Sequence, residues 1–186
     1  MQIKVGISNR HIHLTKEDYE ILFKNEVITQ KKPLVQPDEY ASNMTVTIKG
    51  PKDSIDKVRV LGPFRSYTQV EVSTTDTYKL GITPKVSNSG DLDHAEQLEI
   101  IGPHGQIKRK CAIVPTRHIH LNKEDIKNYN LDVNKIYKVK ITNEKSAILE
   151  NVYLKPSENG VLELHLDTDD ANACLLKQGD YVELIK

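Results

Sequence analysis

The stretch Arg-His-Ile-His-Leu occurs twice in this 186-residue chain, at residues 10–14 and again at residues 117–121. Side chains alternate between the two faces of an extended strand, so the histidines of each copy point one way. The arginine, isoleucine and leucine of each copy then point the other way. Each copy therefore predicts a β-strand that carries two imidazoles on one face and apolar side chains on the other.

A helix start follows each histidine pair. Thr15 and Asn122 can cap a helix, and an acid stands three residues later, Asp18 or Asp125, as in a capping box. We expect short helices at about residues 16–24 and 123–129. The repeated order of strand, histidine pair and helix entry indicates an ancient duplication, since no shorter period is visible.

The rest of the chain reads as short β segments separated by turns. Strands are expected at residues 2–7, 44–48, 57–61, 68–72, 98–101, 107–114, 136–142, 147–154, 160–166 and 181–185, with a helix at about 169–176. The Gly-Pro steps at residues 50–51, 62–63 and 102–103 suit tight turns. Strands at this spacing favour a barrel or a sandwich over a parallel sheet.

Charge and composition exclude several classes of function. The chain has 26 basic and 26 acidic residues and no tryptophan, which gives no general argument for a nucleic-acid or anionic-membrane partner. No apolar run is long enough to span a bilayer, and Met1 is not followed by a signal-like segment. We expect a soluble, cytoplasmic protein. Cys111 and Cys174 form no Cys-x-x-Cys pair, so both are expected to be buried, small apolar residues.

The duplicated histidine pairs indicate metal binding, because neutral imidazole is the commonest protein ligand for zinc-like metals. Each pair needs one more donor if it holds its own ion. His165 emerges between Glu163 and Asp167, opposite a face of leucines, and Glu71 emerges opposite a face of valines. Both residues could instead be solvent-exposed, as His94 and His104 are expected to be.

Two features could bind an oxyanion. Arg65 shares the parity of Glu71 and could hold an oxyanion bidentately, although a solvated arginine is the alternative. The basic stretch from Lys49 to Arg59 could be a solvated edge strand or a docking site for phosphates. No P-loop, dinucleotide-binding glycine loop, Gly-x-Ser-x-Gly or His-Glu-x-x-His occurs. The residues alone indicate a dimetal β protein that acts on an oxyanion or carbonyl substrate.

Several stretches together resemble one known family. They are Ser8-Asn9-Arg10-His11-Ile12-His13-Leu14, Gln36-Pro37, Leu61-Gly62-Pro63-Phe64-Arg65-Ser66, Thr68-Gln69-Val70-Glu71, Ser89-Gly90-Asp91-Leu92, Arg117-His118-Ile119-His120-Leu121 and Leu164-His165-Leu166-Asp167-Thr168-Asp169. In this order, over nearly the whole chain, they resemble the phosphate propanoyltransferases, the phosphotransacylases of the propanediol-utilisation type. The resemblance implies exchange of acyl-CoA plus phosphate with acyl phosphate plus CoA, the acyl group being propanoyl or acetyl.

The resemblance also implies site residues. One zinc would be held by His11, His13 and Glu71 and a second by His118, His120 and His165, although another divalent metal is possible. Arg65 would contact phosphate as the catalytic residue. The CoA contacts that the resemblance implies are Ser8, Asn9, Lys52, Arg59 and Asn172.

The fold that the resemblance implies is mainly β, with two small β-barrels capped by short α-helices and related by duplication. Residues 1–9 plus 116–186 would form the first barrel, and residues 10–115 the second, with a short inserted hairpin near 44–61. A homodimer is implied. Since the first strand begins almost at Met1, a bacterial microcompartment lumen is disfavoured. Asp38 stands where the family usually has glycine, and Asp93 to Gln97 replace a more glycine-rich turn.

Phosphate is expected to attack the thioester carbonyl of the acyl-CoA beside the metals, with Arg65 neutralising its remaining charge. Two alternatives stay open. A metal-dependent hydrolase of a thioester or phosphoester would use the same ligands with water as the nucleophile. A non-catalytic metal-binding module would keep the histidines and turn over no acyl-CoA.

Overall fold

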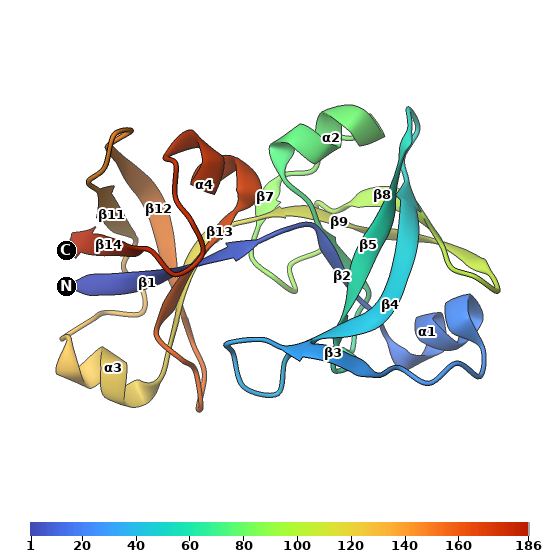
Figure 1. The fold of residues 1–186 in the computed structure, drawn as a ribbon, viewed down its shortest axis with the longest axis horizontal. Helices are drawn as coiled ribbons and strands as arrows, with labels where there is room; N and C mark the ends of the chain where they lie inside the picture. Colours follow the sequence, from blue (N-terminus) through green and yellow to red (C-terminus); the bar gives the residue numbers. More distant parts are fainter. Residues whose placement is uncertain (186) are drawn as a thin grey trace. The chain divides into compact units, whose positions relative to one another are not determined.

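The computed structural model describes residues 1–185, which divide into two compact units. Unit 1 contains Met1–Asn9, Val35–Pro37 and the described residues from Thr116 onward, and unit 2 contains Arg10–Leu34 and Asp38–Pro115. Both units are built mainly from β-strands, as predicted (Figure 1). Residues 35–37, expected in the second barrel, belong to unit 1, where the Gln36 side chain bonds both backbone groups of Val161.

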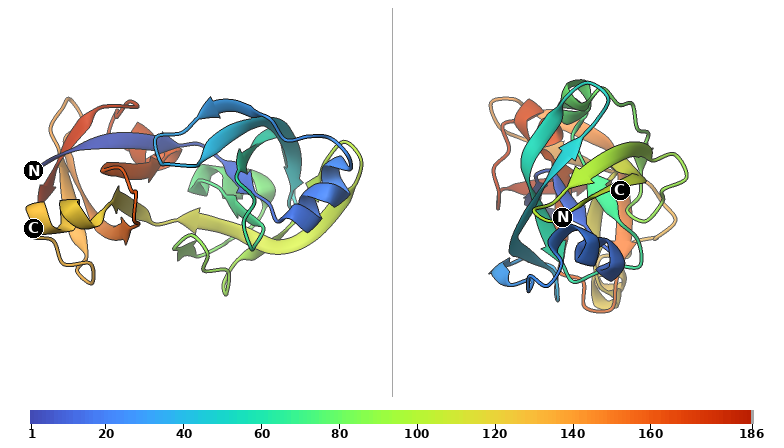
Figure 2. Two further views of the ribbon diagram at one scale, coloured as in Figure 1. Left: turned by 90° about the horizontal axis from the view of Figure 1, so that it is seen from below. Right: turned by 90° about the vertical axis from the view of Figure 1, so that its right-hand side faces the viewer.

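Unit 1 is a closed barrel in the order β1-β13-β10-β12-β11-β14. Its strands are β1 (Gln2–Ser8), β10 (Arg117–Leu121), β11 (Tyr137–Ile141), β12 (Ala147–Pro156), β13 (Glu163–Asp167) and β14 (Tyr181–Ile185). The first and last strands, β1 and β14, are antiparallel neighbours, so the start of β1 lies beside the end of β14 (Figure 2). The pairing of β1 with β14 therefore closes this barrel.

Unit 2 also closes into a ring, because β4 pairs with both β5 and β8, and the order continues β5-β2-β6-β9-β8. Its strands are β2 (His11–His13), β3 (Gln30–Pro33), β4 (Tyr40–Lys49), β5 (Ser54–Gly62), β6 (Gln69–Glu71), β7 (Val86–Ser87), β8 (Glu96–Ile101) and β9 (Gln106–Pro115). Strands β3 and β7 extend the sheet from β4 and β9. The hairpin expected as an insertion near residues 44–61 supplies two full strands of this ring, β4 and β5.

Each unit has its own apolar core, and the duplicated stretch contributes to both. Ile12 and Leu14 are fully buried in the core of unit 2, and Ile119 and Leu121 are fully buried in the core of unit 1. The predicted parity is therefore confirmed. Burial of these side chains contributes roughly 1.5–3 kcal/mol each to folding, and it fixes the histidines on the opposite face of the strand.

Within residues 1–185, four short helices accompany the barrels: α1 (Lys16–Phe23), α2 (Thr74–Leu80), α3 (Lys123–Asn128) and α4 (Thr168–Ala173). Thr15 caps α1, and Asn122 and Asp125 form the predicted capping box of α3. The predicted reciprocal role of Asp18 is wrong, because its carboxylate accepts hydrogen bonds from Thr68 and Arg109 instead. Helix α2, absent from the sequence expectations, starts with a capping box of Ser73 and Asp76.

The two units repeat the same strand arrangement around the histidine pairs. Strand β2 lies between parallel β5 and antiparallel β6, and β10 lies between parallel β12 and antiparallel β13. The arginine before each pair binds the third residue of the helix that follows the antiparallel strand: Arg10 binds Asp76 of α2, and Arg117 binds Asp170 of α4. Such matched long-range contacts support the duplication.

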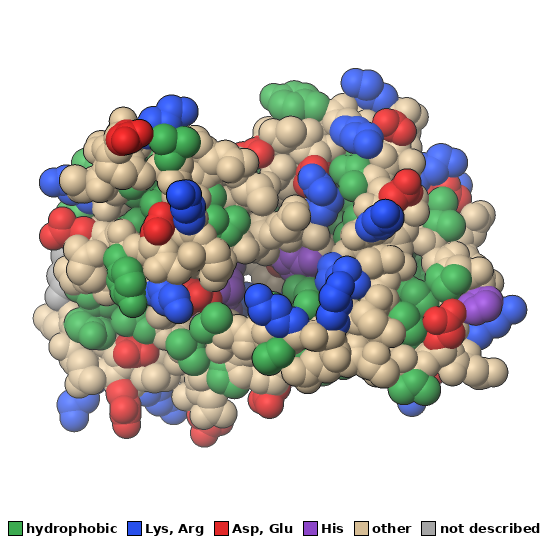
Figure 3. Space-filling view, viewed as in Figure 1, with side chains coloured by type: hydrophobic (Ala, Val, Ile, Leu, Met, Phe, Trp, Pro, Cys, Tyr) green, Lys and Arg blue, Asp and Glu red, His purple; other side chains and the backbone are tan. Residues whose placement is uncertain are grey.

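Two observations concern the outer surface. No helix among residues 1–185 combines the length and apolarity needed to cross a membrane. On the face drawn in Figure 3, acidic and basic side chains are interspersed and form no broad field of one sign. This distribution agrees with the balanced charge of the sequence and gives no support to a polyanion-binding surface on that face.

Candidate metal centres

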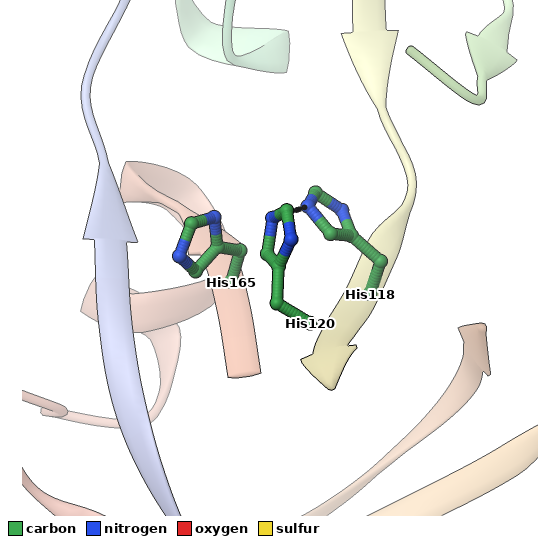
Figure 4. Close-up of side chains that lie close together, drawn as sticks. All are labelled: His118, His120 and His165. Carbon is green, nitrogen blue, oxygen red and sulfur yellow. Dashed lines mark hydrogen bonds between the residues drawn. The ribbon is translucent and has the colours of Figure 1, made fainter. Parts of the chain in front are cut away.

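In unit 1, strands β10 and β13 bring His118, His120 and His165 together (Figure 4). Their ligand atoms lie within 4.8 Å of one another. His118 and His165 are directly opposite in the antiparallel register of the two strands, and His120 follows on the same face of β10. The third donor predicted for this pair is therefore placed beside it by strand pairing alone.

In unit 2, β2 and β6 bring His11, His13 and Glu71 together in the same way. Glu71 lies opposite His11 in the antiparallel register, and its Oε2 is 3.5 Å from His11 Nε2. All three residues are buried, with exposed fractions of 7%, 2% and 8%. A buried carboxylate beside two imidazoles is a donor set suited to a divalent cation.

The distances in unit 1 suit zinc. The Nε2 atoms of His118 and His120 are 3.2 Å apart, and two nitrogens that ligate one tetrahedral zinc at about 2.0–2.1 Å are separated by about 3.3 Å. His118 donates its Nδ1 hydrogen to the Thr116 carbonyl at 2.8 Å, which leaves Nε2 free of hydrogen to face an ion. The residues present therefore fit a zinc ion.

Arg65 is linked to the unit 2 cluster by a chain of polar contacts. Its guanidinium donates to Ser89 Oγ at 3.2 Å and to Glu39 Oε1 at 2.8 Å. Ser89 Oγ also accepts from Gln69 Nε2, which donates in turn to Glu71 Oε1 at 2.7 Å. Arg65 lies outside β6, so the alternation of side chains along that strand does not determine its position. Its contacts with Glu39 and Ser89 link it to the unit 2 cluster instead.

The five residues expected to contact CoA come from both units. Ser8 ends β1, Asn9 follows it and Asn172 is exposed on α4, all in unit 1, whereas Lys52 and Arg59 belong to unit 2. Arg59 donates to the carbonyls of Ser42, Asn43 and Met44, where β4 is irregular, and Lys52 Nζ donates to the Tyr78 carbonyl. Each of these two cations thus has a local structural partner.

Sequence reasoning missed the residues directly behind the third donors. Gln69 lies opposite His13, and Glu163 lies opposite His120, in the same register. Glu163 is only 2% exposed, and its Oε2 accepts from His165 Nε2 at 2.8 Å. The signal was present: both residues stand two positions before a predicted third ligand, and therefore on the same strand face.

The fold and the two clusters define a class: a two-barrel β protein with a duplicated set of metal-ligand residue types. A family model described as phosphate propanoyltransferase matches residues 4–177. The phosphate propanoyltransferase of Thermotoga maritima is 45% identical, over 99% of this chain and 89% of its own length. Those of Priestia megaterium and Levilactobacillus brevis are 44% and 38% identical, over 96% and 100% of this chain and 83% and 89% of their own lengths.

This chain belongs to the phosphate propanoyltransferase family. The resemblance seen in the sequence is therefore confirmed, and the chain is an enzyme, a phosphate acyltransferase.

Proposed function

We propose that this enzyme interconverts a short-chain acyl-CoA plus phosphate with an acyl phosphate plus CoA, using two zinc ions per chain, one in each unit. The acyl group proposed is propanoyl or acetyl. One observation carries the proposal: both barrels present two histidines and a third donor in the same strand register. A surface stripe of histidines would not require a matching donor on the neighbouring strand in both units.

The ligands proposed are His118, His120 and His165 in unit 1 and His11, His13 and Glu71 in unit 2. Bound zinc supplies Lewis acidity, which polarises phosphate or carbonyl oxygens. The chain contributes the ring orientations, as the bond from His118 Nδ1 to the Thr116 carbonyl illustrates. Burial of the unit 2 residues also limits access of water, which would otherwise compete with phosphate for the thioester.

We propose that Arg65 binds the phosphate. A guanidinium presents paired N–H donors that match two oxygens of a tetrahedral oxyanion. Bonds to Glu39 and Ser89 hold the Arg65 side chain in place before phosphate arrives, which reduces the entropy lost on binding. The CoA thiolate is a good leaving group, so no strong general acid is needed to release it.

Ser8, Asn9, Lys52, Arg59 and Asn172 stay proposals for contacts with CoA, and a homodimer in the cytoplasm stays a prediction. The dimer is tested by light scattering coupled to size-exclusion chromatography. The CoA contacts are tested by the KM for CoA in single alanine variants. Lys52→Ala and Asn172→Ala are the most informative, because both residues are exposed.

The reaction is tested by metal analysis of protein purified without a metal-chelating tag, together with thiol release from acetyl-CoA and propanoyl-CoA. About two zinc ions per chain and thiol release that requires phosphate are expected, and the two rates rank the acyl groups. Thiol release that proceeds equally well without phosphate would indicate a hydrolase and not a transferase. If the protein contains no metal and releases no thiol, the two clusters are non-catalytic.

A further inference from the structure

Each histidine pair faces two residues of the antiparallel neighbour strand, not one. We call each pair together with these two residues a block. In unit 1 the block consists of His118 and His120 on β10 with Glu163 and His165 on β13. In unit 2 it consists of His11 and His13 on β2 with Gln69 and Glu71 on β6. The four side chains of each block share one face of their two strands.

The two blocks differ at both positions of the antiparallel strand. Unit 1 has a glutamate followed by a histidine, whereas unit 2 has a glutamine followed by a glutamate. Each block therefore holds a single carboxylate. In unit 2 the carboxylate is the third donor itself, and in unit 1 it stands behind the third donor.

The hydrogen bond between the two residues of the antiparallel strand differs between the blocks in accordance with their residue types. Imidazole N–H is a donor, so His165 needs an acceptor, and Glu163 Oε2 accepts from its Nε2 at 2.8 Å. A carboxylate is an acceptor, so Glu71 needs a donor, and Gln69 Nε2 donates to its Oε1 at 2.7 Å. The Gln69 amide is oriented by Gly90, whose N–H donates to Gln69 Oε1 at 2.7 Å.

The surroundings of Glu163 indicate that the fold accommodates a carboxylate at this position. Its Oε1 is buried and has no hydrogen-bond partner among residues 1–185. On the adjacent strand β1, Gly6 leaves room for it, because a Cβ at Gly6 would lie 2.8 Å from the Glu163 Cδ and 2.9 Å from its Oε2. A buried carboxylate is costly unless it is paired, so its retention beside His165 requires a compensating charge or bond.

We propose that Glu163 is the positioning residue of the unit 1 zinc site: it fixes the His165 ring and supplies the negative charge that Glu71 supplies in unit 2. The bond to Glu163 uses Nε2 of His165, so Nδ1 is the nitrogen left to ligate an ion, and it would face the zinc. Figure 4 shows the His165 ring turned toward His120. The inference rests on the proposed zinc sites, and it assigns to Glu163 a part in one of them only.

The test measures zinc affinity at each site by competition with a chromophoric chelator. Glu163→Ala is expected to weaken one of the two sites by about 10- to 100-fold, the usual cost of losing a carboxylate behind a ligating histidine. The other site keeps its affinity. Glu163→Gln keeps an acceptor for His165 but loses the charge, so a smaller loss is expected. The matched control is Glu150→Gln, which alters a surface glutamate of the same barrel paired with Lys138.

An exchange of the two residues separates positioning from structure. His165→Glu alone places two carboxylates on the same face of β13, one of them the buried Glu163, and is expected to lose zinc at this site. Adding Glu163→Gln to His165→Glu reproduces the order found in unit 2 and is expected to recover at least tenfold in affinity. In cobalt-loaded protein, the visible spectrum of the recovered site is expected to shift, because one imidazole ligand is replaced by a carboxylate.

Four results would overturn the inference. One is unchanged affinity in Glu163→Ala, and another is an equal loss at both sites. The third is a double variant that binds no better than His165→Glu. The fourth is a large fall of Tm in the Glu163 variants relative to the wild type when both are free of metal, which would make Glu163 a structural residue. Wild-type protein that binds no zinc would instead overturn the zinc sites themselves.

Discussion

At the scale of single residues, Arg65 is the clearest case in which position indicates a role. It belongs to no strand, yet Glu39 and Ser89 hold its guanidinium, and Ser89 is bonded to the Gln69 that contacts Glu71. An arginine held on the side of a candidate metal cluster can bind an anion without being a ligand of the ion. Its loss should therefore affect phosphate more than metal.

Arg65→Ala is expected to raise the KM for phosphate about 10- to 100-fold, since a charge-assisted hydrogen bond contributes about 1.5–3 kcal/mol. Zinc content should stay at the wild-type value. Arg65→Lys keeps the charge without the paired donors, so a smaller rise is expected. Steady-state kinetics with varied phosphate and metal analysis of the same preparations give the result, with Lys110→Ala as the surface control. Equal loss of zinc and phosphate use would make Arg65 structural.

Cys111 provides a residue-scale prediction about pH. Burial raises the pKa of its thiol from 9.0 to about 12 in the folded protein, with a smaller contribution from Asp18. The unfolded chain releases this proton above about pH 9 while the folded chain keeps it. Stability is therefore fully present below pH 9 and falls as pH rises toward 12, by up to about 1.4 kcal/mol per pH unit.

Cys111→Ala removes this dependence. At pH 7.5 the variant is expected to be about 1 kcal/mol less stable than the wild type, because a small cavity replaces the sulfur. At pH 10.5 the difference is expected to shrink or reverse. Urea unfolding of both proteins at the two pH values measures it, and a difference that stays constant with pH would show that the thiol ionises equally in both states.

At the scale of elements, each histidine strand is tied to a helix by its arginine. Arg10 binds the carboxylate of Asp76, which is buried and lies in the capping box of α2. The Asp76 carboxylate also raises the pKa of Arg10, mainly through their hydrogen bond, and Asp170 does the same for Arg117. The arginine thus connects the strand that carries the histidines to the helix that follows the third donor.

Arg10→Met is expected to destabilise the protein by about 1–3 kcal/mol, because it leaves the buried Asp76 carboxylate without its cation. The double variant Arg10→Met with Asp76→Asn should recover part of that loss, since the unpaired charge is gone while the helix cap is kept. Chemical denaturation of the wild type, Arg10→Met, Asp76→Asn and the double variant gives the coupling energy. A cost below about 0.5 kcal/mol for Arg10→Met would contradict a structural role for the pair.

The same elements show what sequence can and cannot predict. The faces of β2 and β10 were predictable because alternation of apolar and polar residues is a local property. The partners of the arginines were not, because Asp76 and Asp170 lie 66 and 53 residues away along the chain. Helix α2 was missed although Ser73 and Asp76 have capping-box spacing. Asp38 has a left-handed backbone with φ of 63°, a conformation that glycine adopts at lower cost, which fits the expectation that the family has glycine there.

At the scale of the whole molecule, the duplication explains why each unit carries a complete set of donors. A strand between one parallel and one antiparallel neighbour places its two histidines opposite the donor pair in both barrels. The two blocks differ at that pair, where Gln69 and Glu71 correspond to Glu163 and His165. Such divergence is compatible with two sites that keep the same charge and differ in ligand chemistry.

If each unit holds its own ion, loss of one cluster should leave the other occupied. His13→Ala and His120→Ala are each expected to bind about one zinc per chain, and their combination none, by metal analysis after removal of excess zinc. An ion present at 100 times its Kd stabilises a site by about 2.7 kcal/mol, so zinc should raise the Tm of the wild type more than that of either variant. His94→Ala, in an exposed loop, is the control and should keep both ions. Loss of both ions from a single-site variant would show that the two sites bind metal only together, because separate sites lose their ions one at a time.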